Sequence, residues 1–414
     1  MIYPSLLQSA NIINSNSWFD IQEYKNKNRY VNLSTHNYNY IKTKIIVLNL
    51  NENQKDIINK WLDNVIDIYN LTNEYIKSKL NITSSYDKSN FVSLVNFYNL
   101  RKILKEPTQK ICKINGLNKH TADYGIKHCV EMYKSAYSNL KNKNIKTFEI
   151  KNLLKTRRRK NLVIEPNSVS KNKNSIFYKS LGIIESNLKL SDVIKKNSIL
   201  QYDTLRKKYI IISPEETKNE VNLRQYNKVG IDIGVRTFLT CYSPEKTYSI
   251  GNNTNEYIDR INKRLDNIKS SHDKNKISDS KYIKLYLKYS DKLKNKISDL
   301  HNKSANFLLS KFREITIGKV SIKSMISNLT GNIKSLVKRR LVALSHYKFR
   351  MKLHQMKKKY NVEIKEVSEY LTSKTCSRCN NISKGTKSKI YNCNKCKLKI
   401  DRDINASINI YNID

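Results

Sequence analysis

The sequence predicts an α/β fold in its C-terminal half, and three observations carry that prediction. The segment 228–251 alternates apolar residues with small or polar ones, as a strand hairpin does. Strand-like runs at 314–322 and 361–370 follow, separated by helical patterns. Two Cys-x-x-Cys pairs then precede a short acidic segment that opens a last helix. The 414 residues are enough for two or three domains, each with a buried core.

The first strand of the hairpin has two different faces. Val229, Ile231 and Ile233 are expected on one face, and Asp232 in the middle of the other. A long helical hairpin is predicted from about 255 to 311, because apolar residues recur there at helical spacing.

A single helix is predicted over 333–360, with its inward face formed by Leu341, Leu344, Tyr347 and Met351. The resulting order is strand hairpin, strand, helix, strand, helix, which is the order of an RNase H-like sheet.

Three regions are predicted along the chain. Residues 1–39 are an Asn-rich N-terminal extension for which we expect little regular structure. Residues 40–224 are predicted to form a β platform interrupted by helices, with a helical face at Ile58, Leu62, Val65 and Tyr69. Residues 225–414 form the RNase H-like domain, into which a cysteine module at 372–398 is inserted.

The chain carries a large excess of basic residues. Lysine and arginine number 78 against 35 aspartate and glutamate residues, which gives a formal net charge of +43. Such a charge would repel itself unless a polyanion neutralised it, and nucleic acid is the natural partner. The alternative is a coding bias, because Lys, Asn, Ile and Tyr are abundant and all have AT-rich codons.

Four of the seven cysteines form two knuckles separated by 13 residues. Cys376 and Cys379, with Cys393 and Cys396, supply four thiolates that close a tetrahedral site without an open position. We therefore predict one structural Zn²⁺ ion. The alternative, two unrelated redox motifs, lacks a thioredoxin-like setting. The remaining cysteines are scattered, which suits a reducing compartment: Cys112, Cys129 and Cys241.

Two aspartates are candidate metal ligands. Asp232 stands in an otherwise apolar strand, where an unpaired carboxylate would need a cation or hydrogen-bond partners. Asp403 stands at the start of the last helix, and its alternative role is that of an N-cap. Three acidic groups at the end of a sheet hold Mg²⁺ well, and two such ions hydrolyse phosphodiesters.

Three stretches resemble the transposon-encoded OrfB/TnpB proteins, which are compact RuvC-type, RNA-guided DNA nucleases: "GIDIGVRTFLT", "SEYLTSKTCSRCN" and "DRDINASINI". The match covers residues 225–414 well and 40–220 in general layout. The resemblance implies that Asp232 is the first RuvC carboxylate and Asp403 the last. It also implies that the cysteines belong to a zinc-binding, target-nucleic-acid module, and that 40–224 is a wedge-like platform with a recognition insertion.

The sequence departs from the bacterial pattern at one carboxylate. Gly318 stands where that pattern has a Glu, and Glu314 lies at the wrong end of the strand. Glu369 lies just before the Thr-Ser-Lys-Thr-Cys stretch, as in the eukaryotic and large-virus relatives called Fanzor, which this chain resembles most. That resemblance assigns Glu369 as the third ligand. Asn380 and Lys397 replace the usual knuckle glycines, and we expect a looser second knuckle.

These resemblances imply an RNA-guided DNA endonuclease encoded by a transposable element. Asp232, Glu369 and Asp403 would hold two catalytic Mg²⁺ ions, and the partners would be a guide RNA and a target double-stranded DNA. Two alternatives remain open: a transposase that acts directly on transposon ends, and a guide-dependent DNA-binding protein that does not cut.

We expect an intracellular, soluble protein, nuclear or cytoplasmic depending on the host. The first residues lack the pattern of a signal peptide, and no run of about 18 apolar residues occurs. The run "KTRRRK" at 155–160 is a nuclear import signal, a phosphate-binding patch or a solvated run. Nothing in the sequence indicates a membrane partner or a protein oligomer.

Overall fold

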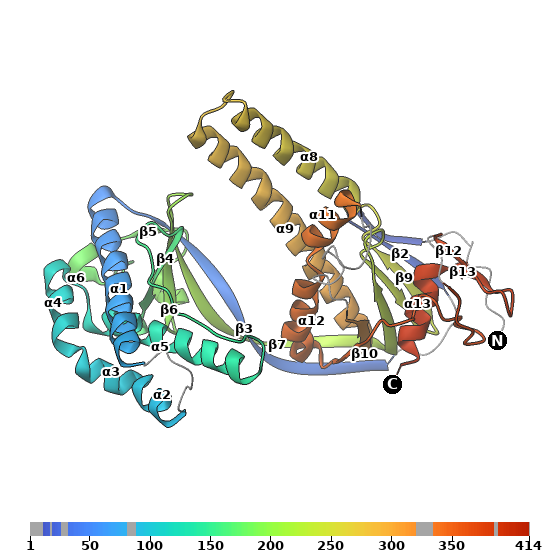
Figure 1. The fold of residues 1–414 in the computed structure, drawn as a ribbon, viewed down its shortest axis with the longest axis horizontal. Helices are drawn as coiled ribbons and strands as arrows, with labels where there is room; N and C mark the ends of the chain where they lie inside the picture. Colours follow the sequence, from blue (N-terminus) through green and yellow to red (C-terminus); the bar gives the residue numbers. More distant parts are fainter. Residues whose placement is uncertain are drawn as a thin grey trace. The chain divides into compact units, whose positions relative to one another are not determined.

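A computed structural model describes residues 11–16, 19–25, 32–80, 88–319, 334–384 and 388–413 (Figure 1). The chain divides into two units. We call residues 41–217 the middle unit, and residues 1–40 together with 218–414 the terminal unit. Each is considered by itself.

The middle unit packs helices on a small sheet. Helix α1 (Glu52–Lys79) begins at a capping box, in which Asn51 Oδ1 accepts from the Gln54 N–H at 2.9 Å and Gln54 Oε1 accepts from the Asn51 N–H at 3.1 Å. The face predicted for α1 is buried, and Gly125 of α5 (Lys119–Lys141) leaves the space that Ile68 fills. The other elements are the last part of β3 (Asn32–Asn49), α2 (Lys88–Leu94), α3 (Phe97–Ile103), α4 (Lys105–Asn115), β4 (Arg159–Ile164), η1 (Pro166–Ser168), α6 (Tyr178–Leu181), β5 (Glu185–Ser186), α7 (Leu190–Val193), β6 (Ser198–Asp203) and the first part of β7 (Lys208–Ile233).

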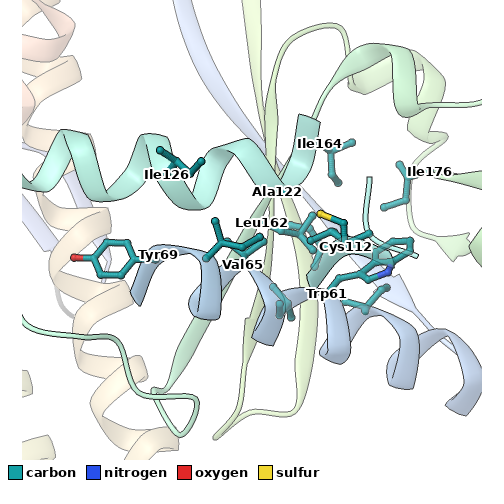
Figure 2. Close-up of a cluster of buried hydrophobic side chains, with 14 of the residues drawn as sticks. Trp61, Val65, Tyr69, Cys112, Ala122, Ile126, Leu162, Ile164 and Ile176 are labelled. Carbon is teal, nitrogen blue, oxygen red and sulfur yellow. The ribbon is translucent and has the colours of Figure 1, made fainter. Parts of the chain in front are cut away.

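The core of this unit joins α1 to the sheet. Figure 2 shows Trp61, Val65 and Tyr69 near Ile126 of α5 and Leu162 of β4. Burial of each such side chain stabilises the fold by about 1.5–3 kcal/mol.

Part of the basic run 155–160 is paired with acidic side chains of the middle unit. Its ion pairs join Lys155 to Asp67 (2.8 Å), Arg158 to Asp203 (3.3 Å) and Lys160 to Asp63 (2.6 Å).

The terminal unit is built on a mixed sheet whose strands follow the order β2-β9-β8-β7-β10-β11. Strands β10 (Phe312–Gly318) and β11 (Glu363–Val367) are parallel to each other, and β10 is parallel to β7. The pairs β7–β8, β8–β9 and β9–β2 are antiparallel. The predicted strand hairpin is thus present as β7, β8 (Leu239–Tyr242) and β9 (Lys246–Ile250).

The N-terminal residues differ from expectation. Strands β1 (Asn11–Asn16) and β2 (Phe19–Lys25) form within the extension for which little regular structure was expected. Strand β2 pairs with β9, and Ile21 is buried in the core of the terminal unit, so burial supplies an order that the Asn-rich composition did not suggest.

Helices cover the sheet of the terminal unit. The predicted hairpin is formed by α8 (Thr254–Asp273) and α9 (Asp279–Lys311), which run side by side (Figure 1). The prediction of one helix over 333–360 was wrong, because the chain breaks at Ser345 (φ +48°) into α11 (Ser335–Leu344) and α12 (His346–Tyr360).

The break also changes which residues face inward. It shifts the helical register, so that Tyr347 is 61% exposed while His346 and Phe349 are buried. The remaining elements are β12 (Ile390–Asn392), β13 (Lys399–Asp401) and α13 (Arg402–Tyr411). Among the residues described, none of the helices combines the length and the apolar character that a membrane span requires.

Candidate active site and metal centre

Strand β7 carries Asp232 on the face opposite its buried apolar residues. Ile231 and Ile233 are 0% and 8% exposed in the core of the terminal unit. Asp232 itself is partly exposed and pairs across the sheet with Thr240 of β8. The strand alternation therefore separates the carboxylate from the core, as the sequence predicted.

Helix α13 packs directly on that face of β7. A Cβ built at Gly230 would overlap backbone atoms of Ser407 and Tyr411, so the close approach requires glycine at this position. The first turn of α13 lies close enough to Asp232 for the charges of Arg402 and Asp403 to act on its carboxyl group.

The N-cap of α13 is Asp401, not Asp403. Asp401 Oδ1 accepts hydrogen bonds from the N–H groups of Asp403 (2.9 Å) and Ile404 (3.3 Å). The Asp403 carboxylate instead accepts a hydrogen bond from Arg402 Nη2 at 3.0 Å. The alternative role considered for Asp403 is thus taken by its neighbour, and the Asp403 carboxylate is paired with Arg402 instead.

Glu369 lies over the end of the neighbouring strand. Gly318 ends β10 and pairs with Val367 of β11, two residues before Glu369. A Cβ built at Gly318 would overlap Oε1, Cγ and Cδ of Glu369. Glu314, at the other end of β10, lies 3.6 Å from the Lys228 ammonium and forms part of a different cluster.

The three carboxylates interact electrostatically. Burial first, and then the negative charges of Glu369 and Asp403, raise the pKa of Asp232 well above its usual range, while Arg402 opposes the rise. Burial raises the pKa of Glu369 to about 7, against the lowering effect of Arg350. Glu369 Oε1 is buried and has no hydrogen-bond partner among the described residues. A bound cation would offset the repulsion between the carboxylates and would give Glu369 Oε1 a partner.

The spacing of these carboxylates limits how they could hold metal. Within the described parts of the chain, the one group of three or more His, Cys, Asp or Glu side chains whose ligand atoms all lie within 4.8 Å of one another is the cysteine group. Oxygens that share one Mg²⁺ at about 2.1 Å lie no more than about 4.2 Å apart. All three carboxylates together are therefore spaced too widely for a single ion in this arrangement.

The four cysteines meet as predicted. Cys376 Sγ lies 3.5 Å from Cys396 Sγ, and Cys379 Sγ lies 3.6 Å from Cys393 Sγ. Zn–S bonds of about 2.3 Å in a tetrahedron give S···S distances of about 3.8 Å, so the group fits such an ion.

The two knuckles have the same backbone form. Asn380 (φ +57°) and Lys397 (φ +59°) both occupy the left-handed region. The Asn380 N–H donates to Cys376 O at 2.9 Å, and the Lys397 N–H donates to Cys393 O at 3.0 Å. The second knuckle therefore has the same backbone form as the first, although Lys397 adopts a conformation that costs a non-glycine residue about 1–2 kcal/mol.

Two asparagines of α13 hold the entry of the cysteine module. Asn405 Nδ2 donates to Thr375 O at 2.7 Å, and Asn405 Oδ1 accepts from the Ser377 N–H at 3.0 Å. Asn409, one turn later, donates to the carbonyl oxygens of Thr372 (2.7 Å) and Thr375 (2.8 Å). The helix that carries Asp403 thus also fixes the segment between Glu369 and the cysteines.

Sequence reasoning missed several of these supporting residues. The i,i+4 spacing of Asn405 and Asn409 was a readable signal for a shared helix face. No sequence signal marked Arg350, a 5% exposed residue of α12 whose Nε lies 3.5 Å from Glu366 Oε2.

Comparisons with known proteins place this chain in a family. Residues 211–329 match a family model described as a probable transposase, OrfB_IS605, and residues 346–410 match the Cas12f1-like TNB domain. Among solved structures, a Cas12f1–sgRNA–target DNA complex covers 90% of this chain and 99% of its own at 18% identity and a TM-score of 0.35.

Two curated relatives come from Acanthamoeba polyphaga mimivirus. TnpB-like protein L79 is 34% identical over 393 residues, which cover 90% of this chain and 73% of that protein. TnpB-like protein L770 is 34% identical over 389 residues, with the same two coverages. On identity of this extent, together with the OrfB match, the chain belongs to the TnpB-like family of OrfB proteins.

Proposed function

We propose that this protein is an RNA-guided DNA endonuclease encoded by a transposable element, with an RNase H-like nuclease domain of the RuvC type. The observation that carries the proposal is the position of Glu369 over Gly318, beside Asp232 on the adjacent strand β7. A carboxylate from a later segment fills the place of the one missing from β10. The Fanzor branch of the family has such a relocated Glu.

The residues present fit a pair of divalent cations. Asp232, Glu369 and Asp403 offer oxygen ligands, which Mg²⁺ prefers. Their mutual repulsion, seen in the raised pKa of Asp232, and the unpartnered oxygen of Glu369 favour bound positive charge. In this arrangement the three carboxylates do not all come close enough together to share one ion, so the proposal assigns them to a pair of ions. When bound, two ions would activate a water molecule and stabilise the leaving oxygen of a phosphodiester.

The protein's own residues position these ligands. Asp232 is held by the sheet, and Asp403 is oriented by its hydrogen bond to Arg402. Asp401 caps α13 and so fixes the turn from which Asp403 projects. Asn405 and Asn409 then fix the segment that follows Glu369. The backbone that carries each carboxylate is thus fixed by its own set of contacts.

We assign one structural Zn²⁺ to the four cysteines, since four thiolates leave no open position for catalysis. The module that they close lies within the match to the TNB domain, and we propose that it contacts target DNA. The net charge of +43 supports a polyanionic partner. Region 40–224 would hold guide RNA and read a short duplex motif, while base pairing supplies the specificity.

The test begins with the RNA that copurifies with the protein. We would sequence this RNA, reprogramme its guide segment and incubate the complex with Mg²⁺ and plasmids that carry the matching target beside random flanking sequences. Guide-dependent cutting is expected, and Asp232→Ala should abolish it while RNA still copurifies. Cutting that ignores the guide, or survives Asp232→Ala, would contradict the proposal.

Strand transfer is a second candidate, because one matching family model is described as a probable transposase. Both reactions use acidic residues and divalent ions on phosphodiesters. An experiment without RNA distinguishes the two reactions. The protein is incubated with DNA that carries transposon ends, and joined DNA products would favour the transposase.

A further inference from the structure

A basic pocket lies in the terminal unit between α9 and α12. Its volume is about 490 Å³, and Lys294, Lys348 and Lys352 line it together with Asn295 and Gln355. None of the proposed metal ligands takes part in it. It is large enough for part of a ligand and supplies both charge and hydrogen-bond donors.

The described acidic side chains do not neutralise the positive charge of this pocket. No acidic side chain lines it. Its three lysines form no ion pair with any acidic side chain that the structure describes, whereas basic residues nearby do. Arg339 of α11 lies 2.7 Å from Asp266, and Lys303 of α9 lies 3.2 Å from Asp299. The lysines of the pocket are thus available to an external anion.

The pocket also contains the start of α12. Ser345 lines it, and α12 begins at His346 without a side-chain cap and without an acidic residue in its first turn. Helix α11 ends at the same point, at Leu344, so the partial charges of the two helix ends offset each other and the lysines supply the positive charge of the pocket.

The buried wall of the pocket includes a histidine whose pKa responds to the charge of these lysines. His301 lines the pocket, is 4% exposed and has its Nε2 2.8 Å from Leu344 O. Its pKa is lowered to about 4, by burial first and further by the charges of Lys352 and Lys348.

We propose that this pocket binds a phosphate group of a nucleic-acid backbone, with the three lysines as counter-charges and Asn295 and Gln355 as donors to phosphate or sugar oxygens. The choice of a polynucleotide as the polyanion rests on the proposed function. A phosphodiester of guide RNA and one of DNA present the same chemistry, so the experiment has an arm for each.

The main experiment compares two triple variants of the full chain, both in an Asp232→Ala background that prevents cutting. Lys294→Gln, Lys348→Gln and Lys352→Gln remove the charge of the pocket. Lys281→Gln, Lys284→Gln and Lys288→Gln remove the same charge from exposed positions on α9 outside it. The probes are a fluorescent single-stranded RNA and a DNA of the same sequence, titrated at several salt concentrations.

The pocket variant should bind at least one probe about 10-fold more weakly, and the slope of log affinity against log salt should become shallower by about 2. The control variant should change binding less than about 3-fold. Loss for RNA alone assigns the pocket to a guide, and loss for DNA alone assigns it to a target. Equal losses in the two variants would overturn the proposal.

A second measurement needs no variant and so is independent of folding. Amine-reactive labelling of the unaltered chain, with and without the RNA or DNA probe, should show protection of Lys294, Lys348 and Lys352. Unchanged labelling of all three with both probes bound would also overturn the proposal. Binding does not require cleavage, so the two proposals can fail separately. If the probe protects these lysines but the protein never cuts DNA, only the proposed nuclease function is refuted. If the protein cuts DNA but the probe does not protect the lysines, only the proposed phosphate-binding pocket is refuted.

Discussion

The carboxylate of Glu369 occupies the space that a side chain at position 318 would fill. Strands β10 and β11 are in parallel register, with Gly318 opposite Val367, so the segment after β11 turns back over the end of β10. Glu369 can therefore occupy this position only because residue 318 is a glycine.

Replacing Glu369 by Gln should reduce DNA cutting by at least about 100-fold, because the amide removes one negative ligand from the proposed metal pair. Glu314→Gln is the matched control, since Glu314 lies at the far end of the same β10 strand and is paired with lysines. Rates are measured on the guided substrate under single turnover. Similar rates for the two variants would show that Glu369 is not a ligand.

Gly318→Ala should also reduce cutting, by about 10-fold to 100-fold, because the added Cβ overlaps Glu369 and displaces its carboxylate. The double variant Gly318→Glu with Glu369→Ala should recover part of the activity, since it returns the carboxylate to β10. A Gly318→Ala enzyme as active as the parent would contradict the pairing.

The two aspartates at the start of α13 should separate stability from catalysis. Asp401→Ala removes the N-cap and should lower the free energy of unfolding by about 1 kcal/mol. Asp403→Ala leaves the cap intact and should abolish cutting with little change in Tm. Thermal unfolding and cleavage of both variants check this, and the reverse pattern would restore the N-cap role to Asp403.

Metal analysis should find one zinc ion per chain, and Cys379→Ser should lower that content. Stripping the zinc with a chelator and then supplying excess Mg²⁺ should leave guided cutting lost, because the knuckles cannot close without a tetrahedral ion. Cys241→Ser, at a buried cysteine outside the group, is the control. Full cutting by a zinc-free protein would show that the module is dispensable.

Two buried histidines should make the terminal unit sensitive to acid. The pKa of His346 is lowered to about 3 and that of His301 to about 4, in both cases by burial first. Above pH 6.5 neither the folded nor the unfolded chain protonates these groups. Below it, only the unfolded chain takes up the protons, so the free energy of unfolding falls by about 1.4 kcal/mol per pH unit for each histidine.

His346→Phe tests this directly. The phenyl ring keeps the stacking that His346 makes with Phe238, whose ring centroid lies 5.4 Å away, and it cannot be protonated. The Tm of this variant should fall less steeply between pH 6.5 and 4 than that of the parent. If Tm fell equally steeply with decreasing pH in the variant and the parent, His346 would be protonated in the folded state.

Periodicity and residue type allowed much of the fold to be predicted. The alternation around Asp232, the helical hairpin and the strands of the sheet were readable because burial of one face imposes a period on the sequence. The four-cysteine group was readable because two Cys-x-x-Cys knuckles carry their own local geometry. The break at Ser345 and strand β2 were not, since each depends on packing against residues distant in the sequence.

By itself, the sequence determined which side chains are chemically able to form the site: oxygen ligands at Asp232 and Asp403, and thiolates at the four cysteines. Only the tertiary structure decided how they are arranged. It gave the N-cap to Asp401, brought Glu369 over Gly318, and used Asn405 and Asn409 to hold the cysteine module. The physical reason is that these contacts depend on which backbones approach closely, and glycine at positions 230 and 318 allows that approach only after the sheet and α13 have assembled.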